Sequence, residues 1–127
     1  MTAHKNIRTA LCAAQSNMGK VVKNSVNPAF KSRYADLADV MSVVVPALTE
    51  QGIAVFHSMI REDGQLMMRT TLAHGETDTE INCDIPLLVQ KQDMQGMKSA
   101  TTYAKRIGSE SLTGVAGDEG GGGAAAR

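Results

Sequence analysis

The sequence predicts an α+β fold with the element order α-α-β-β-β-α. Apolar residues recur at helical spacing before residue 52, alternate with polar residues between 53 and 86, and return to helical spacing after residue 94. A chain of 127 residues suits a single domain with its own core. We therefore expect a three-stranded antiparallel meander packed against helices, formed by residues 1–116, and a flexible Gly- and Ala-rich tail at residues 117–127.

The first helix is predicted to begin near Ile7. One face of the segment is apolar or small as far as Val21 or Val22, which corresponds to about four turns. Pro28 interrupts the pattern, because it lacks an amide donor and disfavours helical dihedrals at the residue before it. Residues 24–28 are therefore expected to form a loop.

The second helix is predicted to follow Ser32, whose hydroxyl can cap it. Asp36 would then lie in the first turn, near the positive end of the helix dipole. Gly52 marks the end of the helical pattern. Pro46 lies inside the helix, and it predicts a kink or a short break near Val45.

Three strands are predicted next. Apolar and polar residues alternate over 53–60 and 65–73, which predicts two strands joined by a turn at 61–64. A second turn at 74–76 leads to the third strand, which Pro86 ends. One face of that strand is expected to be buried and the other is acidic: Thr77, Thr79, Ile81, Cys83 and Ile85 alternate with Asp78, Glu80, Asn82 and Asp84.

Helical spacing returns over about residues 94–115 and predicts the last helix. Its apolar stripe includes Met97, Ala104 and Leu112. The opposite side is polar and basic, with Lys98, Thr102, Lys105, Arg106 and Ser109.

Charge is segregated along the chain. The 13 basic and 13 acidic residues cancel, which excludes a protein that coats nucleic acid through bulk charge alone. Residues 1–34 hold six basic residues and no acid, residues 35–97 hold ten acids against three basic residues, and a second basic stretch begins at Lys98. This segregation predicts one face for a polyanion and another for solvent or a neighbouring subunit, whereas basic helix faces that are merely solvated are the alternative.

Several other classes of protein are excluded or disfavoured. No apolar run approaches the ~20 residues that span a bilayer, and no signal peptide is evident, so a cytoplasmic protein with no membrane contact and with free Cys12 and Cys83 is expected. The glycine-rich phosphate loop of ATPases is absent. The histidines His4, His57 and His74 fall on three different predicted elements and lack the spacing of metal ligands. The acidic pair Asp118 and Glu119 lies in the predicted tail.

Three of the four aromatic residues lie in the basic segments, namely Phe30, Tyr34 and Tyr103. Proteins that hold single-stranded nucleic acid combine cations that follow the phosphates with rings on which bases stack. Tyr34 also begins an apolar stripe, so a role in the core is the alternative for it.

Two segments then resemble a known family. Residues 27–37, NPAFKSRYADL, followed by Pro46-Ala47-Leu48 and Gly52-Ile53-Ala54-Val55, resemble the N-terminal signature of the Erf family of phage single-strand annealing proteins. Residues 99–106, SATTYAKR, followed by Leu112-Thr113-Gly114-Val115 and Asp118-Glu119, resemble its second signature. The chain departs from that signature where the family often has two arginines followed by an aromatic residue, because it has Lys105, Arg106 and then Ile107.

This resemblance implies an ATP-independent recombinase that needs no cofactor. Such a protein binds single-stranded DNA and the annealed duplex, forms homo-oligomeric rings or filaments, and pairs complementary strands in homologous recombination and repair. Its β-β-β-α core would be similar to that of ring-forming annealing proteins. The resemblance also suggests a phage protein working in the host cytoplasm with a 5'-3' exonuclease and a host single-strand-binding protein.

The residues expected to contact DNA come from both basic segments. Lysines and arginines would neutralise phosphates, the tyrosines would stack on or space the bases, and the hydroxyls would donate hydrogen bonds. The set is Lys23, Lys31, Ser32, Arg33, Tyr34, Lys98, Ser99, Thr102, Tyr103, Lys105 and Arg106. One alternative is a metal-dependent nuclease or hydrolase that uses Asp118, Glu119 and a histidine. The other is a purely structural oligomer in which basic segments meet the acidic strand face of the next subunit.

Overall fold

The computed structural model describes residues 3–19, 25–27, 32–34 and 36–116. The main elements confirm the predicted α+β order α-α-β-β-β-α, and a short pair of strands is added between the first two helices. The elements are α1 (Ile7–Gln15), β1 (Ser25–Asn27), β2 (Ser32–Tyr34), α2 (Leu37–Glu50), β3 (Ile53–Glu62), β4 (Gln65–His74), β5 (Thr79–Pro86) and α3 (Met94–Thr113). The predicted tail at 117–127 lies outside the described residues.

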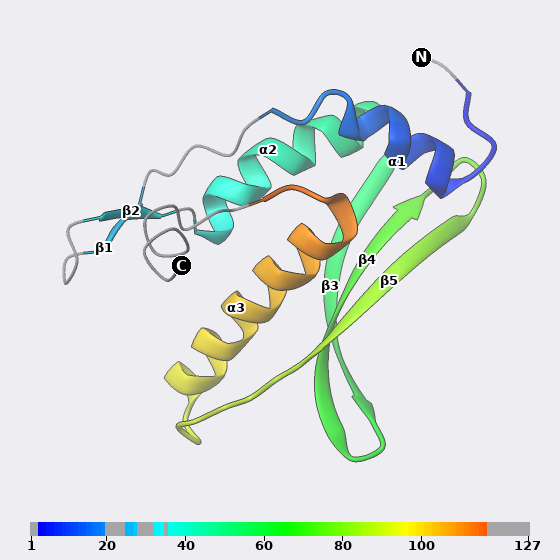
Figure 1. Ribbon diagram of the computed structural model, residues 1–127. Helices are drawn as coiled ribbons and strands as arrows, with labels where there is room; N and C mark the ends of the chain where they lie inside the picture. Colours follow the sequence, from blue (N-terminus) through cyan, green and yellow to red (C-terminus); the bar gives the residue numbers. More distant parts are fainter. Residues whose placement is uncertain (1–2, 20–24, 28–31, 35, 117–127) are drawn as a thin grey trace.

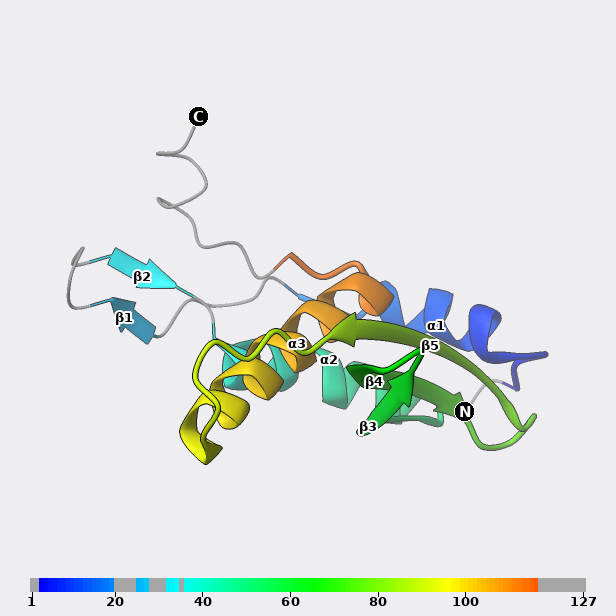
Figure 2. The same ribbon diagram turned by 90° about the horizontal axis from the view of Figure 1, so that it is seen from below.

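The central sheet is the predicted antiparallel meander with strand order β3-β4-β5. The helices α1, α2 and α3 lie on one face of it (Figures 1 and 2). The first hairpin turn is tighter than predicted, because Asp63 and Gly64 alone form it with φ values of 51° and 80°. Two positive φ values match the twist of the flanking strands. The strand β3 therefore extends to Glu62, further toward the turn than the alternation indicated, whereas β4 begins at Gln65 as predicted.

The core lies between the sheet and the helices in two clusters. In the larger one, Ile53 and Leu72 of the sheet pack against Ala10 of α1 and Val44 and Leu48 of α2. In the smaller one, the sheet and the segment after β5 pack against α3 through Met68, Leu87 and Ala104. The opposite face of the sheet has no helix on it among the described elements.

Two predictions about α2 are wrong. Asp36, not Ser32, is the N-cap: its Oδ1 accepts from the Asp39 amide at 3.0 Å, and Asp39 Oδ2 accepts from the Asp36 amide at 3.0 Å. This reciprocal capping box satisfies two amides that have no partner inside the helix. Ser32 pairs with Asn27 in the β1–β2 hairpin instead. The short break predicted at Pro46 is absent, since α2 runs continuously from Leu37 to Glu50 with Pro46 exposed and Ala47 beside it buried.

The first helix is shorter than predicted. It ends at Gln15, and residues 16–19 are not helical. Gln15 Nε2 donates to the carbonyl of Thr113 at 2.8 Å, which ties the end of α1 to the end of α3. The loop predicted at residues 24–28 is wrong for Ser25–Asn27, which form β1 and pair with β2, with Val26 opposite Arg33. This hairpin lies on the helix side, beyond the N-terminal end of α2 and away from the sheet (Figures 1 and 2).

The last helix begins as predicted and ends two residues earlier, at Thr113. Its predicted polar side is not wholly exposed, because Ser109 is buried and the side chain of Arg106 is mostly covered. Within the described parts of the chain, every helix is too short or too polar to cross a bilayer.

Candidate nucleic-acid interface

The predicted binding residues whose side chains the structure describes all lie on α3. Residues three and four apart share one side of a helix, so Gln95, Ser99 and Thr102 form a row along the surface. Tyr103 lies beside this row with 64% of its surface exposed. The remaining predicted residues on α3 are Lys98, Lys105 and Arg106. The helix therefore presents an aromatic ring to solvent among hydroxyl and cationic groups.

Two adjoining hollows flank this surface. The first, which we call the α2 hollow, lies between α3 and the N-terminal end of α2 and is lined by Asp36, Lys98, Thr102 and Arg106. The second, which we call the loop hollow, lies between α3 and the segment after β5 and is lined by Leu88, Gln90, Lys91, Gly96 and Ala100. Three residues line both hollows, namely Gln95, Ser99 and Tyr103. The hollows are thus two parts of one surface, and they meet at the tyrosine ring.

The hydroxyls of this surface differ in their availability. Thr102 Oγ1 donates to the Lys98 carbonyl at 2.9 Å, so its proton is used within the helix while its oxygen can still accept. Ser99 is exposed, and within the described part of the chain its hydroxyl has no hydrogen bond. Ser99 is therefore the better donor toward a phosphate oxygen.

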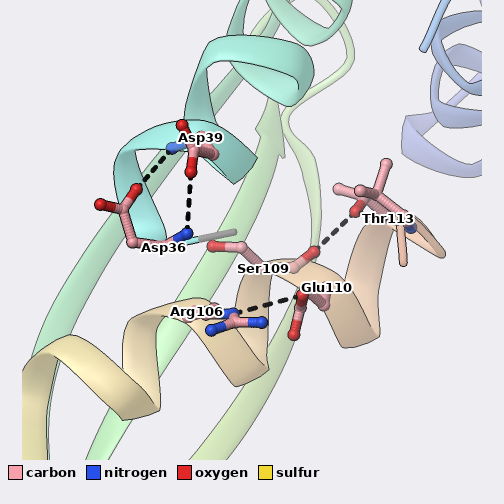
Figure 3. A network of polar contacts seen from close by, with 7 residues as sticks. Asp36, Asp39, Arg106, Ser109, Glu110 and Thr113 are labelled. Atoms are coloured by element: carbon pink, nitrogen blue, oxygen red, sulfur yellow. Dashed lines mark hydrogen bonds and ion pairs between the residues drawn. The ribbon is translucent and has the colours of Figure 1, made fainter. Parts of the chain in front are cut away.

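Arg106 lies in a polar network between α3 and the start of α2 (Figure 3). Its Nε is 3.4 Å from Glu110 Oε2, and only 13% of its side chain is exposed. Asp36 and Asp39 form their capping box on the facing helix. Because its charge is balanced by a carboxylate and its side chain is mostly covered, Arg106 contributes mainly to the wall of the α2 hollow.

Lys105 faces the sheet and not the α2 hollow. Its positive charge acts on His57 of β3, whose Nδ1 lies 2.9 Å from Thr70 Oγ1. Burial, and secondly the charge of Lys105, lower the pKa of His57 below its ordinary value. The adjacent cations Lys105 and Arg106 therefore lie on different sides of α3, and the structure does not bring them together as one phosphate site.

The predicted binding residues of the N-terminal segment lie in or beside parts of the chain that the structure does not describe. Lys23 and Lys31 lie outside the described residues. The backbone of Ser32, Arg33 and Tyr34 forms β2, and nothing further is described for these three residues. The groove expected between this segment and α3 stays a prediction.

Sequence reasoning missed the wall of the loop hollow. Leu87 is buried and Val89 packs against the smaller core cluster, so Leu88 between them and Gln90 after them are exposed. The signal was present as an alternation that continues past Pro86, although that proline ends the strand.

Among the described residues, no group of three or more His, Cys, Asp or Glu side chains could hold a metal ion. His4 and His74 do meet, with ring centroids 6.0 Å apart. Cys12 is exposed, Cys83 is half-buried, and both are free thiols. Asp118 and Glu119 lie outside the described residues.

Comparison with known proteins gave one family. A family model described as the ERF superfamily matches residues 7–120, which covers α1 to α3 and most of the chain. The searches of curated proteins and of solved structures gave no match.

Proposed function

The chain belongs to the ERF superfamily, and on that premise we propose that it anneals complementary DNA strands without ATP. In this proposal it binds single-stranded DNA through the phosphate backbone, self-associates, and pairs strands during recombination. No bond is made or broken, so the protein needs binding groups and no catalytic group. The family is one of annealing and not hydrolysis, which favours this function over a nuclease.

The observation that carries the proposal is the exposed Tyr103 between the two hollows of α3. Its ring is available for stacking, and the cations Lys98 and Lys91 are exposed on its two sides. Stacking on an aromatic ring contributes about 1–3 kcal/mol per base and tolerates every sequence. A surface of this kind binds strands irrespective of sequence, which is what annealing of arbitrary complements requires.

Backbone binding also explains how such a protein accelerates pairing. Neutralised phosphates release counterions and repel a second strand less. Strands held on neighbouring subunits are also concentrated relative to one another. Bases that do not contact the protein stay free to pair.

Self-association is supported by the distribution of charge over the two sides of the molecule. The face of the sheet away from the helices carries Glu80 and Asp84, of which Asp84 pairs with Arg69 at 2.8 Å. Phe56 on the same face is 48% exposed. Because the α3 surface is basic and this face is acidic, copies arranged head to tail would attract one another. Sedimentation of the protein without DNA, at low and high salt, tests this association directly.

The test of function is an annealing assay without ATP. Complementary oligonucleotides labelled with a fluorophore and a quencher are mixed with the protein at two salt concentrations, and the rate of quenching is followed. Acceleration over the protein-free rate, and a smaller acceleration at high salt, is expected. A labelled strand incubated with Mg²⁺ reveals any cleavage. A folded protein that neither accelerates pairing nor binds the strand would overturn the proposal.

Variants of the α3 surface connect this activity to the site. Lys91→Ala/Lys98→Ala removes two exposed cations and is expected to reduce the slope of log affinity against log salt by roughly 0.7 for each phosphate that is no longer neutralised. Lys5→Ala/Arg8→Ala is the matched control, because both cations are exposed at the other end of the fold, before and on α1. An equal change of slope in both pairs would contradict the assignment to α3.

A further inference from the structure

We propose that the loop hollow is a subsite for one unpaired nucleobase of the bound strand. The proposal rests on the proposed function and assigns a different part of the nucleotide to each hollow. The phosphate binds at the α2 hollow beside Lys98, and the base of the same nucleotide enters the loop hollow across Tyr103.

The outer wall of the loop hollow is held by packing on both of its flanks. The Leu87 amide donates to the Leu66 carbonyl at 2.9 Å, and the Leu87 side chain is 5% exposed. Val89 packs against the same core cluster. Leu88, between these two anchored residues, is 75% exposed. Its exposure therefore follows from the packing of its neighbours, and the apolar side chain is presented to the hollow at a fixed place.

The far end of the wall lies directly on the first turn of α3. A Cβ atom at Gly96 would overlap the Lys91 carbonyl and lie 3.0 Å from the Lys91 Cβ. The Gly96 amide donates to Asp93 Oδ1 at 2.7 Å, which caps the helix at this point. The glycine thus lets the segment close onto α3 and brings Lys91 to the rim of the hollow.

The chemistry of the hollow matches a nucleobase better than a phosphate. Leu88, Ala100 and the ring of Tyr103 offer apolar surface for a flat ring. Gln90 and Gln95 add amide groups that both donate and accept, and neither is hydrogen-bonded through its side chain within the described chain. A volume of about 510 Å³ lies within the usual range of ligand sites, ~300–1,000 Å³.

Continuity with the α2 hollow favours a base over other occupants. Three residues, Gln95, Ser99 and Tyr103, line both hollows, so a nucleotide with its phosphate near Lys98 has its base within reach of Leu88. An aliphatic side chain from a second copy would also fit the apolar part, but it would leave both amides without partners. One base in each subunit would thus be withheld from pairing, while the bases between subunits stay free.

The experiment compares an oligo-dT strand with an abasic strand of the same length, using the purified chain and fluorescence anisotropy. The abasic strand keeps every phosphate, so it measures the backbone contribution alone. Because stacking contributes about 1–3 kcal/mol per base, one bound base should give at least about a fivefold tighter dissociation constant for oligo-dT. Leu88→Ser removes the apolar wall that faces Tyr103, so it should reduce this preference and leave the affinity for the abasic strand unchanged.

Met94→Ser is the matched control, because Met94 is 83% exposed on the first turn of α3 and lines neither hollow. Equal affinity of the wild-type protein for both strands, or an unchanged preference in Leu88→Ser, would overturn the base subsite while the proposed function stands. Loss of self-association in Leu88→Ser, with its base preference intact, would assign the hollow to a second copy. Failure of the wild-type protein to bind either strand would overturn the proposed function itself.

Discussion

Gly108 of α3 lies directly against Thr70 of β4. A Cβ atom at position 108 would overlap the Thr70 hydroxyl and lie 3.0 Å from the Thr70 Cβ. Thr70 is fully buried and its hydroxyl is bound to His57 Nδ1, so it has no room to move aside. The absence of a side chain at Gly108 therefore sets how closely α3 approaches the sheet, and with it the position of the surface that carries Tyr103.

Gly108→Ala tests this close approach. Alanine stabilises an exposed helix by about 1 kcal/mol relative to glycine, but forcing a methyl group into a packed contact costs about 1–3 kcal/mol. Because the overlap with Thr70 is severe, we expect the cost to exceed the gain and the free energy of unfolding, measured with urea, to fall by up to about 2 kcal/mol. Ser111→Ala, at an exposed position on the same helix, should leave stability unchanged or raise it slightly. A stabilised Gly108→Ala would show that the contact is looser than described.

His57 predicts a dependence of stability on pH. Its pKa is lowered in the folded protein by burial and by Lys105, so the folded state favours the neutral ring. The unfolded chain takes up the proton first as the pH falls through about 6.5. Stability is therefore complete above this pH and decreases below it, until the lowered native pKa is reached.

The measurement compares the wild type with His57→Gln, in urea titrations between pH 5 and 8. Their difference in unfolding free energy should be larger at pH 8 than at pH 5, because only the wild type loses the contribution of a neutral histidine. NMR titration of the ring locates the native pKa directly, and Lys105→Ala should raise it. Parallel stability curves for the two proteins would contradict a lowered pKa.

The sheet and α3 were predictable because their patterns are local and unambiguous. Strict alternation from Ile53 onward, a short turn and a further alternation leave few arrangements other than a meander. The start of α2 was not predictable in the same way, since Ser32 and Asp36 are both good caps within one turn. Pairing of Ser32 with Asn27 in the small hairpin decides between them, and that contact is not encoded in the cap residues.

Long-range contacts also account for what was missed at the site. Gln15 ends α1 through a hydrogen bond to a residue 98 positions away. Lys105 and Arg106 are adjacent in sequence, but neighbours on a helix point about 100° apart. Lys105 therefore lies toward the sheet, and Arg106 lies toward α2. Leu88 is exposed because Leu87 and Val89 on either side of it pack on the core, and the alternation past Pro86 indicates this exposure but not the hollow beside it.

Ser109 provides a test of the packing between α2 and α3. It is 1% exposed, and in the described structure its Oγ has no hydrogen-bond partner. A buried hydroxyl without a partner costs free energy, and alanine removes it while favouring the helix by about 0.5 kcal/mol. Ser109→Ala is therefore expected to unfold at the same urea concentration as the wild type or a higher one. Destabilisation by more than about 1 kcal/mol would mean that the hydroxyl is bonded in solution.

Gly96→Ala separates the shape of the loop hollow from its apolar surface. The added methyl group would overlap the Lys91 carbonyl, so the segment after β5 must move away from the first turn of α3. Leu87 is anchored in the core, and the displacement should therefore be absorbed between Leu88 and Asp93. The hollow would widen while Leu88, Tyr103 and both lysines remain present. We expect the preference for oligo-dT over the abasic strand to fall severalfold, with the affinity for the abasic strand nearly unchanged. Circular dichroism verifies that the total helix content is unchanged, and an unaltered preference in a folded Gly96→Ala protein would show that the closed wall is not needed for the base.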